Sequence, residues 1–281
     1  MTRYITMAYG DAPAVYRQSL MMLVSLTAHA PEPFEIVVVT DRPDRFVWFG
    51  TRIEIDFLDS ERLEKWRGPN PFSMRHKLEL ARSSIVDGRQ EIVLLDADVL
   101  VRKPLGSFIE RLRSGDLFMH KREYVLSETR RVGNRKLWHE LKKRGFRMDD
   151  GMWNSGVLAL PSADRDLLDA SLDMYDALGA DGVRHFATEQ LVEGVVLGRT
   201  GRLKPAEEWF IHYWGNKPGY DAEISRFLAD AFIDGLSAKD AASRYRDNPI
   251  DLPSEIRPTP FQKLLKRING SPDHEIRKSR T

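Results

Sequence analysis

The sequence predicts an α/β fold built on a doubly wound, largely parallel sheet. Short runs of β-branched and aliphatic residues alternate with longer segments of helical periodicity through the first half of the chain. The run at 91–95 is almost entirely apolar, as in a strand covered by helices on both faces. At 281 residues the chain is long enough to bury a large core. Ligands of such sheets bind beyond the carboxyl ends of the strands, so polar residues at those ends are the candidates for function.

Each element follows from its local pattern. We expect strands at 3–8, 34–40 and 52–58, a strand that carries two aspartates within 91–101, and a further strand at 156–160. Helices are expected at 13–29, which lacks glycine and has apolar residues at helical spacing, at 72–86, at 164–178, from Thr188 onward, and from 221 to about 246. Prolines at 249, 253, 258 and 260 then indicate a linker. We therefore divide the chain into a domain at 1–220 and a helical C-terminal extension with a basic tail at 221–281.

Composition limits the class of protein. Hydrophobic residues make up 42% and charged residues 30% of the chain, which is ordinary for a soluble protein, and a net charge of +1 does not favour nucleic-acid binding. The absence of cysteine excludes disulfides and thiol catalysis and is compatible with a reducing compartment. The first residues lack the apolar core of a signal peptide, and no apolar run approaches the length of a membrane span. We expect a cytoplasmic protein.

The most informative motif is Asp96-Ala-Asp98, which interrupts an apolar run. Two carboxylates so close together repel each other unless a cation lies between them. A hard divalent ion bound by carboxylate oxygens keeps positions open for phosphate oxygens and water, so the motif predicts a metal-bridged diphosphate. An isolated Asp-x-Asp is weak support, because aspartate often only caps a strand or a loop.

Four further motifs stand in a fixed order around the two aspartates. They are the lysine of Arg75-His-Lys77, the segment Trp153-Asn-Ser-Gly156, where a polar turn opens a strand, and the helix start Thr188-Glu-Gln190. The last is Ile211-His-Tyr-Trp-Gly-Asn-Lys-Pro218, a strand that runs into a glycine-containing turn. Each has an ordinary structural explanation when taken alone. Lys77 can be a surface lysine, His212 a core histidine, and Gln190 a helix-cap partner.

Together, the ordered motifs resemble the GT-A fold nucleotide-sugar glycosyltransferases, in particular the retaining family of glycogenin and the bacterial lipopolysaccharide galactosyl- and glucosyltransferases. The resemblance covers about residues 3–218. It implies a GT-A type, Rossmann-like mixed sheet flanked by helices, with the helical C-terminal extension added to it. It also implies that Asp96, Asp98 and His212 hold Mn²⁺ or Mg²⁺, and a histidine ligand favours Mn²⁺.

The resemblance assigns the remaining residues to the donor. Lys77 matches the lysine that contacts the nucleotide part, and the strand-end loop with Ala8, Tyr9 and Asp11 matches the uracil and ribose site. Asn154, Glu189 and Gln190 match the polar residues that lie beside the transferred sugar in the family, and we take them as the catalytic set. Gly215 and Lys217 match the turn around the diphosphate. Three departures stand out: Lys217 follows His212 by only five positions, Gly219-Tyr220 replaces the usual Trp after Lys-Pro, and Glu189 stands where the family usually has Asp.

The chemistry of sugar transfer agrees with this set. Cleavage of a sugar–phosphate bond leaves a nucleoside diphosphate whose growing negative charge a divalent ion and a lysine can stabilise. The resemblance favours retention. An inverting enzyme would need a carboxylate base, for which Asp149 or Asp150 can be considered, although Asp149-Asp-Gly151 is equally typical of a turn.

Two other functions compete with transfer from a UDP-sugar to a glycan or lipid-linked acceptor of the cell envelope. A sugar-nucleotide pyrophosphorylase normally has a glycine-rich, basic loop after its first strand, whereas residues 9–14 contain one glycine and no basic residue. A non-catalytic nucleotide-sugar-binding protein would keep the fold without an intact metal site.

Two basic segments suggest partners. Residues 121–147 contain ten Lys or Arg against three Glu, which fits either a solvated helix face or a border of the acceptor cleft that favours an anionic acceptor. In 261–281, the spacing of Phe261, Leu264, Leu265 and Ile268 predicts a short amphipathic helix followed by a basic tail. This helix either docks on the domain or makes peripheral contact with an anionic membrane surface.

Overall fold

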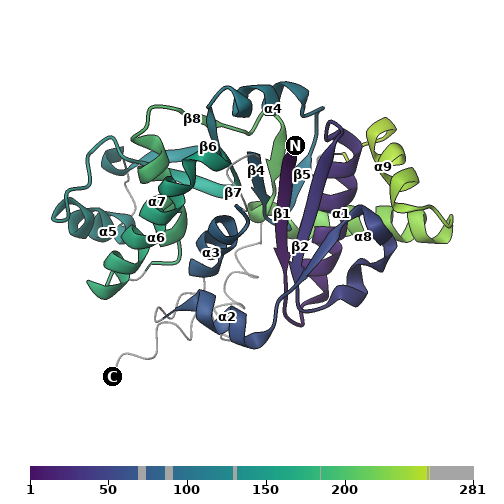
Figure 1. Cartoon of the computed structure of the whole chain (residues 1–281), viewed down its shortest axis with the longest axis horizontal. Helices are drawn as coiled ribbons and strands as arrows, with labels where there is room; N and C mark the ends of the chain where they lie inside the picture. Colours follow the sequence, from purple (N-terminus) through teal and green to yellow (C-terminus); the bar gives the residue numbers. More distant parts are fainter. Residues whose placement is uncertain (69–73, 86–90, 129–131, 184, 252, 254–281) are drawn as a thin grey trace, which may run out of the picture.

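The protein is a three-layer α/β structure in which helices cover both faces of a seven-stranded mixed sheet (Figure 1). The strand order is β3-β2-β1-β4-β7-β6-β8. This computed structural model describes residues 1–68, 74–85, 91–128, 132–183, 185–251 and 253. The predicted α/β class and mixed sheet are confirmed, while the amphipathic helix and tail expected at 261–281 lie outside the described residues.

The parallel half of the sheet follows the sequence prediction closely. It is formed by β1 (Thr2–Ala8), β2 (Phe34–Thr40), β3 (Glu54–Phe57) and β4 (Glu91–Leu95). The strand predicted at 52–58 is shorter than expected, because a 3₁₀ segment, η1 (Pro43–Arg52), precedes it. Four consecutive residues of β4, from Ile92 to Leu95, are almost fully buried, as expected for a strand between two helical layers.

The other half of the sheet is mixed, because one of its three strands runs antiparallel to β4 and two run parallel to it. It contains β7 (Gly151–Pro161), which pairs with β4 and with β6 (Leu117–Val125), and β8 (Leu203–Pro205), which runs parallel to β6. β7 is longer than the predicted 156–160, because the polar residues before Gly156 are paired with β6 rather than forming a free turn. The register between β6 and β7 shifts twice, so the strand pair is irregular near the middle of β7.

A second, two-stranded sheet crosses beside the carboxyl end of β4. Its strands are β5 (Val99–Val101) and β9 (Phe210–His212), which are antiparallel. The strand predicted to carry both aspartates within 91–101 is therefore two strands in two different sheets, and Asp96 to Asp98 form the turn between them. The strand–turn prediction for 211–218 agrees with β9 followed by a 3₁₀ turn, η4 (Trp214–Asn216).

One face of the main sheet is covered by α1 (Pro13–His29), α4 (Gly106–Arg113), α8 (Lys217–Ile233) and α9 (Ala238–Asp247). α1 lies between the sheet and the last two helices, and its apolar residues are in one hydrophobic cluster with Ile224, Leu228 and Tyr245. The helix predicted at 221–246 is two helices, separated at Gly235, and the first begins at Lys217. The described part of the C-terminal extension thus packs directly on α1 (Figure 1, right).

The opposite face is covered by α2 (Ser60–Arg67), α3 (Arg75–Ser83), α6 (Arg165–Ala180) and α7 (Thr188–Gly198), with α5 (Val132–Lys142) beside them. α3 is shorter than the predicted 72–86, and α6 follows a short 3₁₀ segment, η3 (Ser162–Asp164). A further 3₁₀ turn, η2 (Leu126–Glu128), follows β6. α2 is not predicted from the sequence; Asp59 caps it by accepting a hydrogen bond from the Arg62 amide at 2.7 Å.

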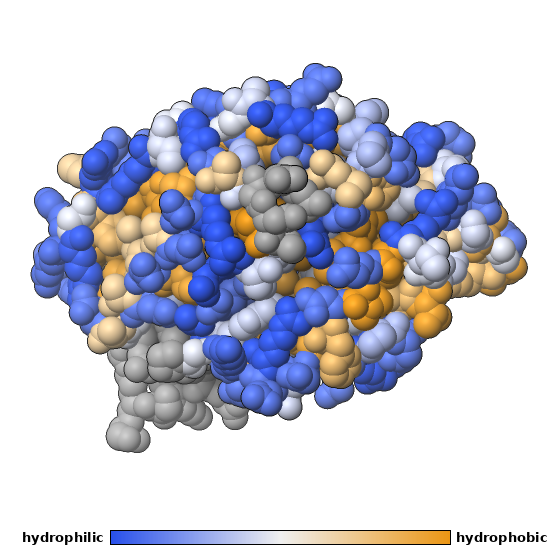
Figure 2. Space-filling view, in the orientation of Figure 1, coloured by the Kyte–Doolittle hydropathy of each residue, from blue (hydrophilic) through white to orange (hydrophobic). Residues whose placement is uncertain are grey.

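Hydrophilic residues cover most of the face seen in Figure 2, and apolar side chains show mainly in smaller patches between them. Within the described part of the chain, no helix has both the length and the apolar character that a membrane span requires.

Candidate metal and nucleotide site

Three predicted metal ligands meet at the carboxyl end of β4. Asp96 is fixed by its own amide, which donates to the Gly156 carbonyl of β7 at 2.9 Å. The pairing of Val99 with His212 then places the imidazole beside the Asp96-to-Asp98 turn, and the Tyr213 amide donates to the Asp98 carbonyl at 3.2 Å. One donor atom from each of Asp96, Asp98 and His212 lies within 4.8 Å of the others.

The tautomer of His212 follows from its neighbour Asn154. The Nδ1 atom of His212 lies 2.6 Å from the Asn154 Oδ1, which also accepts a hydrogen bond from the Gly156 amide at 3.1 Å. Because Oδ1 can only accept, the Nδ1 atom carries a proton, so in the neutral form of the ring it is the Nε2 atom that presents a lone pair. That atom lies 3.2 Å from Asp98 Oδ1 and 3.9 Å from Asp96 Oδ2.

The three donors fit a divalent cation. A lone pair that faces two carboxylates is repelled unless a cation or a proton lies between them, and one nitrogen with carboxylate oxygens is a usual donor set for a first-row divalent metal. Asn154 supplies the outer hydrogen bond that metal-binding histidines commonly make through their other ring nitrogen. The amide of Asn154 also donates to Glu123 Oε1 at 3.3 Å, which fixes its orientation.

Gly156 allows the imidazole to lie against β7. A Cβ atom at this position would be 2.2 Å from His212 Nδ1 and 2.5 Å from its Cε1, so any side chain would displace the ring. The sequence pattern predicts Gly156 only as part of a strand, without a role in the site. Its only signal in the sequence is a glycine inside a strand, which often marks a close approach of another group.

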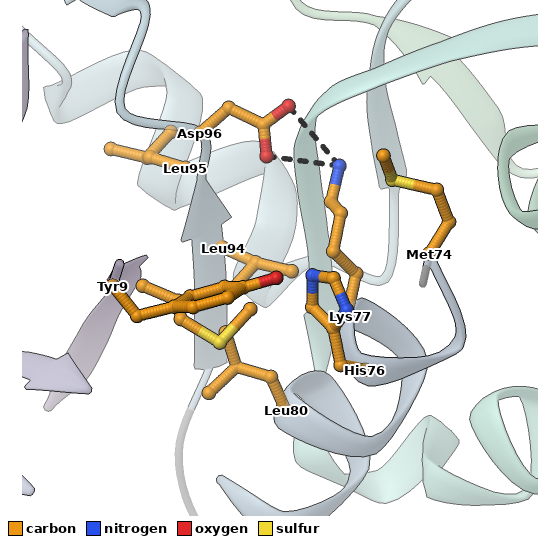
Figure 3. Close-up of a pocket in the computed structure, with 9 residues that line it drawn as sticks. Tyr9, Met74, His76, Lys77, Leu80, Leu94, Leu95 and Asp96 are labelled. Atoms are coloured by element: carbon orange, nitrogen blue, oxygen red, sulfur yellow. Dashed lines mark hydrogen bonds and ion pairs between the residues drawn. The ribbon is translucent and has the colours of Figure 1, made fainter. Parts of the chain in front are cut away.

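Lys77 connects the metal ligands to α7. Its Nζ atom lies 2.9 Å from Asp96 Oδ1 (Figure 3). It also lies 3.3 Å from Glu189 Oε1 and donates to the Ser155 carbonyl and hydroxyl oxygens at 3.2 Å. Burial alone would lower the pKa of Lys77, but the carboxylates of Asp96, Glu189 and Glu193 raise it above its ordinary value. The lysine is therefore charged and balances the buried carboxylates.

Two glutamates of α7 stand one helical turn apart beside this lysine. Glu189 accepts a hydrogen bond from the Ser155 hydroxyl at 3.1 Å, and the side chain of the fully buried Glu193 contacts Glu189. Burial, and then the charge of Glu189, raises the pKa of Glu193 well above its ordinary value. Burial therefore favours the protonated form of Glu193, and Lys77 forms its ion pair on α7 with Glu189.

Lys217 reaches Asp98 despite the short turn after His212. Its Nζ atom lies 2.8 Å from Asp98 Oδ2, and 46% of its side chain remains exposed. Burial alone would raise the pKa of Asp98, yet a hydrogen bond from His212 in its protonated form and the charge of Lys217 hold it below its usual range. With His212 neutral, the carboxylates of Asp96, Asp98 and Glu189 outnumber the two lysines by one, so the site favours an added cation.

A cavity of about 180 Å³ opens next to these charges. It is bounded by Tyr9 at the end of β1, by His76, Lys77 and Leu80 of α3, and by Asp96 (Figure 3). The rings of Tyr9 and His76 meet edge to face at 5.5 Å. Burial, followed by the charges of Lys77 and Arg67, lowers the pKa of His76 to about 4, so this wall of the cavity is neutral.

The loop after β1 is held by a residue that the sequence analysis did not select. Asp41 Oδ2 accepts from the Gly10 amide at 3.1 Å, and the Tyr16 hydroxyl donates to both the Gly10 carbonyl and Asp41 Oδ1. Asp41 follows β2, next to β1 in the sheet, so its position at a strand end was the available signal. Of the predicted loop residues, Ala8 is buried, Tyr9 lines the cavity, and Asp11 is exposed and outside the cavity lining.

The other predicted residues make few contacts with the cluster of Asp96, Asp98 and His212. Gln190 is half-buried at the start of α7, next to Glu189, and makes no side-chain hydrogen bond to another described residue. Gly215 lies in the exposed η4 turn, with open space around its α-carbon. Asp149 and Asp150 line a separate cavity, where Arg199 holds Asp150 through two hydrogen bonds.

Sequence comparison and structural comparison give different results. No protein-family model and no curated protein matches the sequence. The structure is similar to mouse xyloside xylosyltransferase 1 in its apo form, with a TM-score of 0.50 and 13% identity over 73% of this chain and 84% of that one. The structure is also similar to an active-site mutant of LgtC, with a TM-score of 0.50 and 19% identity over 73% of this chain and 72% of that one. For the galactosyltransferase LgtC in complex with donor and acceptor sugar analogues, the TM-score is 0.49 and the identity 16%, over 73% of both chains.

The first two of these similarities carry the conclusion, and at such low identity they concern the fold. They cover 73% of this chain and agree with the GT-A type mixed sheet flanked by helices that the resemblance implied. This chain therefore has the GT-A fold of the glycosyltransferases.

Proposed function

We propose that the protein is a metal-dependent glycosyltransferase that moves a sugar from a UDP-sugar to a glycan or lipid-linked acceptor with retention of configuration. The observation that carries this proposal is the convergence of Asp96, Asp98 and His212 at the strand ends of a GT-A fold. In doubly wound sheets this is where nucleotides bind. Two lysines contact the same carboxylates, so the surroundings of the cluster suit a diphosphate.

The donor would lie across the charged strand ends. Tyr9 and His76 offer a neutral, partly aromatic cavity for the base, while Lys77 and Asp96 form its charged wall. Asp96, Asp98 and His212 would hold Mn²⁺, which when bound supplies Lewis-acid stabilisation of the negative charge that grows on the leaving diphosphate. The half-exposed Lys217 can donate to a phosphate oxygen on the same side.

The reaction breaks the bond between the anomeric carbon and the phosphate oxygen, and the bonding electrons leave with the nucleoside diphosphate. The acceptor oxygen forms the new bond, and its proton passes to the departing phosphate. Gln190 suits the sugar side, because its amide can both donate to and accept from sugar hydroxyls without taking a proton. The engagement of Asp150 with Arg199 in a separate cavity supports retention over an inverting reaction with that carboxylate as base.

The acceptor and the location of the protein are proposed from charge. The basic segment 121–147 favours an anionic acceptor, as on phosphorylated or lipid-linked glycans of a cell envelope. We place the protein in the cytoplasm, with peripheral membrane contact through the basic stretch at 261–281.

The test is turnover of a panel of UDP-, GDP- and dTDP-sugars with and without Mn²⁺, measured as release of the nucleoside diphosphate. Asp98→Asn should reduce Mn²⁺-dependent turnover by at least about 100-fold, because metal stabilisation of the leaving group is worth several kcal/mol. Asp247→Asn, which removes an exposed carboxylate of α9, is the matched control and should leave turnover unchanged. No release from any donor, or full activity of Asp98→Asn, would reject the proposal.

A further inference from the structure

A second cavity, of about 320 Å³, lies between α7 and the β6–β7–β8 side of the sheet. Its size is near the lower end of small-molecule pockets, which span about 300–1,000 Å³. Five charged residues line it: Arg122, Arg147, Arg199, Asp149 and Asp150. Trp153 supplies an apolar wall. None of these residues belongs to the metal and nucleotide site.

The arginines of this cavity are unequally paired. Arg199 is held by Asp150, with hydrogen bonds of 3.1 and 2.7 Å. The guanidinium groups of Arg122 and Arg147 are exposed and have no carboxylate or other side-chain partner among the described residues. Three guanidinium groups against two carboxylates leave the lining with a net positive charge, concentrated on these two arginines.

Glycines form the space into which these charges project. Gly151 and Gly194 let β7 and α7 approach each other: a Cβ atom at Gly194 would lie 2.8 Å from the Gly151 carbonyl oxygen and from Trp153 Cδ1. Gly198, at the end of α7, has open space instead, since a Cβ there would meet only Leu203 Cδ2 at 3.9 Å. The backbone of β7 and α7 therefore shapes the cavity. A larger side chain at position 198 could fill it, because its Cβ atom would not clash with a neighbouring residue.

The cavity and the metal site use neighbouring residues of the same two strands. Arg122 and Trp153 line the cavity, whereas Glu123 and Asn154 are hydrogen-bonded to each other beside His212. Because successive residues of a strand point to opposite sides, Trp153 and Asn154 face opposite sides of β7, and the two cavities have no lining residue in common. A ligand in the cavity would therefore not occupy the place of the donor.

We propose that this cavity binds a small phosphorylated sugar. A phosphomonoester carries a charge of about −1.5 to −2 at neutral pH, which matches two guanidinium groups without a partner. Guanidinium groups bind phosphate oxygens through paired hydrogen bonds. The carboxylate of Asp149 can accept hydrogen bonds from sugar hydroxyls, and Trp153 can pack against the sugar. The proposal is independent of the metal site.

The test is calorimetric titration of the full-length protein, without Mn²⁺ or nucleotide, using glucose 6-phosphate as the probe. The double variant Arg122→Gln/Arg147→Gln should bind at least tenfold more weakly. The control Arg135→Gln/Lys142→Gln removes the same charge from exposed positions of α5 in the same basic segment, and should bind like the unmodified protein. Lys217→Gln should also keep the affinity, which excludes binding beside the metal ligands.

A steric test does not depend on charge. Gly198→Leu should fill the cavity and abolish binding, whereas Gly198→Ala should not. Glucose tests whether the phosphate is needed and should not bind; glucuronate tests whether a carboxylate replaces it and should bind more weakly. The proposal is overturned if the unmodified protein does not bind glucose 6-phosphate at millimolar concentration, if the arginine and Gly198→Leu variants both bind normally, or if glucuronate binds equally well.

Discussion

Removal of the Asn154 side chain should separate metal binding from the rest of the fold. In Asn154→Ala, two donors lose their acceptor at once: the His212 Nδ1–H, at 2.6 Å, and the Gly156 amide, at 3.1 Å. The ring of His212 can then adopt the other tautomer or rotate, so that Nε2 is no longer presented as a lone pair to Asp96 and Asp98. Loss of such an outer hydrogen bond typically weakens metal binding by 10–100-fold, or about 1.4–2.7 kcal/mol.

The same change should also reduce stability, by a separate amount. Asn154 is almost fully buried, so each donor left without a partner costs about 1–3 kcal/mol unless water replaces the amide. Mn²⁺ affinity, measured by the loss of the free-ion electron paramagnetic resonance signal, and the free energy of unfolding, measured with urea, should both fall.

A compensated variant distinguishes positioning from mere packing. Asn154→Asp combined with Glu123→Gln keeps an acceptor for His212 and exchanges the roles of the hydrogen-bonded pair at 3.3 Å. It should recover most of the Mn²⁺ affinity. Unchanged affinity in Asn154→Ala would refute the role of this amide, and an equal loss in the compensated variant would reduce that role to packing.

Three further predictions address single residues. Gly156→Ala should abolish Mn²⁺ binding, since its Cβ would lie 2.2 Å from His212 Nδ1; calorimetry with Mn²⁺ checks this, with Gly215→Ala, which meets only open space, as the control. Gln190→Ala should reduce sugar transfer much more than it weakens the binding of free UDP, and equal losses would place Gln190 away from the sugar. Because the pKa of Glu193 is raised in the folded state, its stabilising contribution is complete below about pH 4.5 and is lost as the pH rises toward the raised value. Glu193→Gln should therefore be more stable than the unmodified protein at pH 8 but not at pH 4, and urea unfolding at both values tests this sign.

Elements with strong local signals could be predicted from the sequence. The strand Phe34–Thr40 is bounded as expected, because its apolar run ends at Asp41 and Pro43, and the helix Pro13–His29 begins with a proline at its first turn. The helix Ser60–Arg67 was missed, because it is polar and buries only Trp66, so it lacks an apolar stripe. The start of β7 was read as a turn, because its pairing with β6 depends on residues distant in the sequence.

In the candidate site, too, some features could be predicted from the sequence and others could not. The residue types at Asp96, Asp98, His212 and Lys217 could be selected from motif order, and the structure brings their side chains together. The contacts that support these residues could not be predicted from the sequence. Asn154 and His212 are 58 positions apart, and their hydrogen bond depends on the second sheet lying against β7. Asp41 and Gly156 act through backbone geometry, which a single sequence does not reveal.

Two of the three departures from the family pattern have a common physical consequence. The longer side chain at Glu189 is held by Lys77 and Ser155, and Lys77 in turn contacts Asp96, one of the proposed metal ligands. The short turn before Lys217 ends at the other metal ligand, with its Nζ atom 2.8 Å from Asp98 Oδ2. Each lysine is thus paired with one of the two aspartates. Neutralising Asp98 would leave the half-exposed Lys217 without its partner and available to a diphosphate, whereas the buried Lys77 would keep Glu189. We therefore assign charge balance to Lys77 and direct contact with phosphate to Lys217.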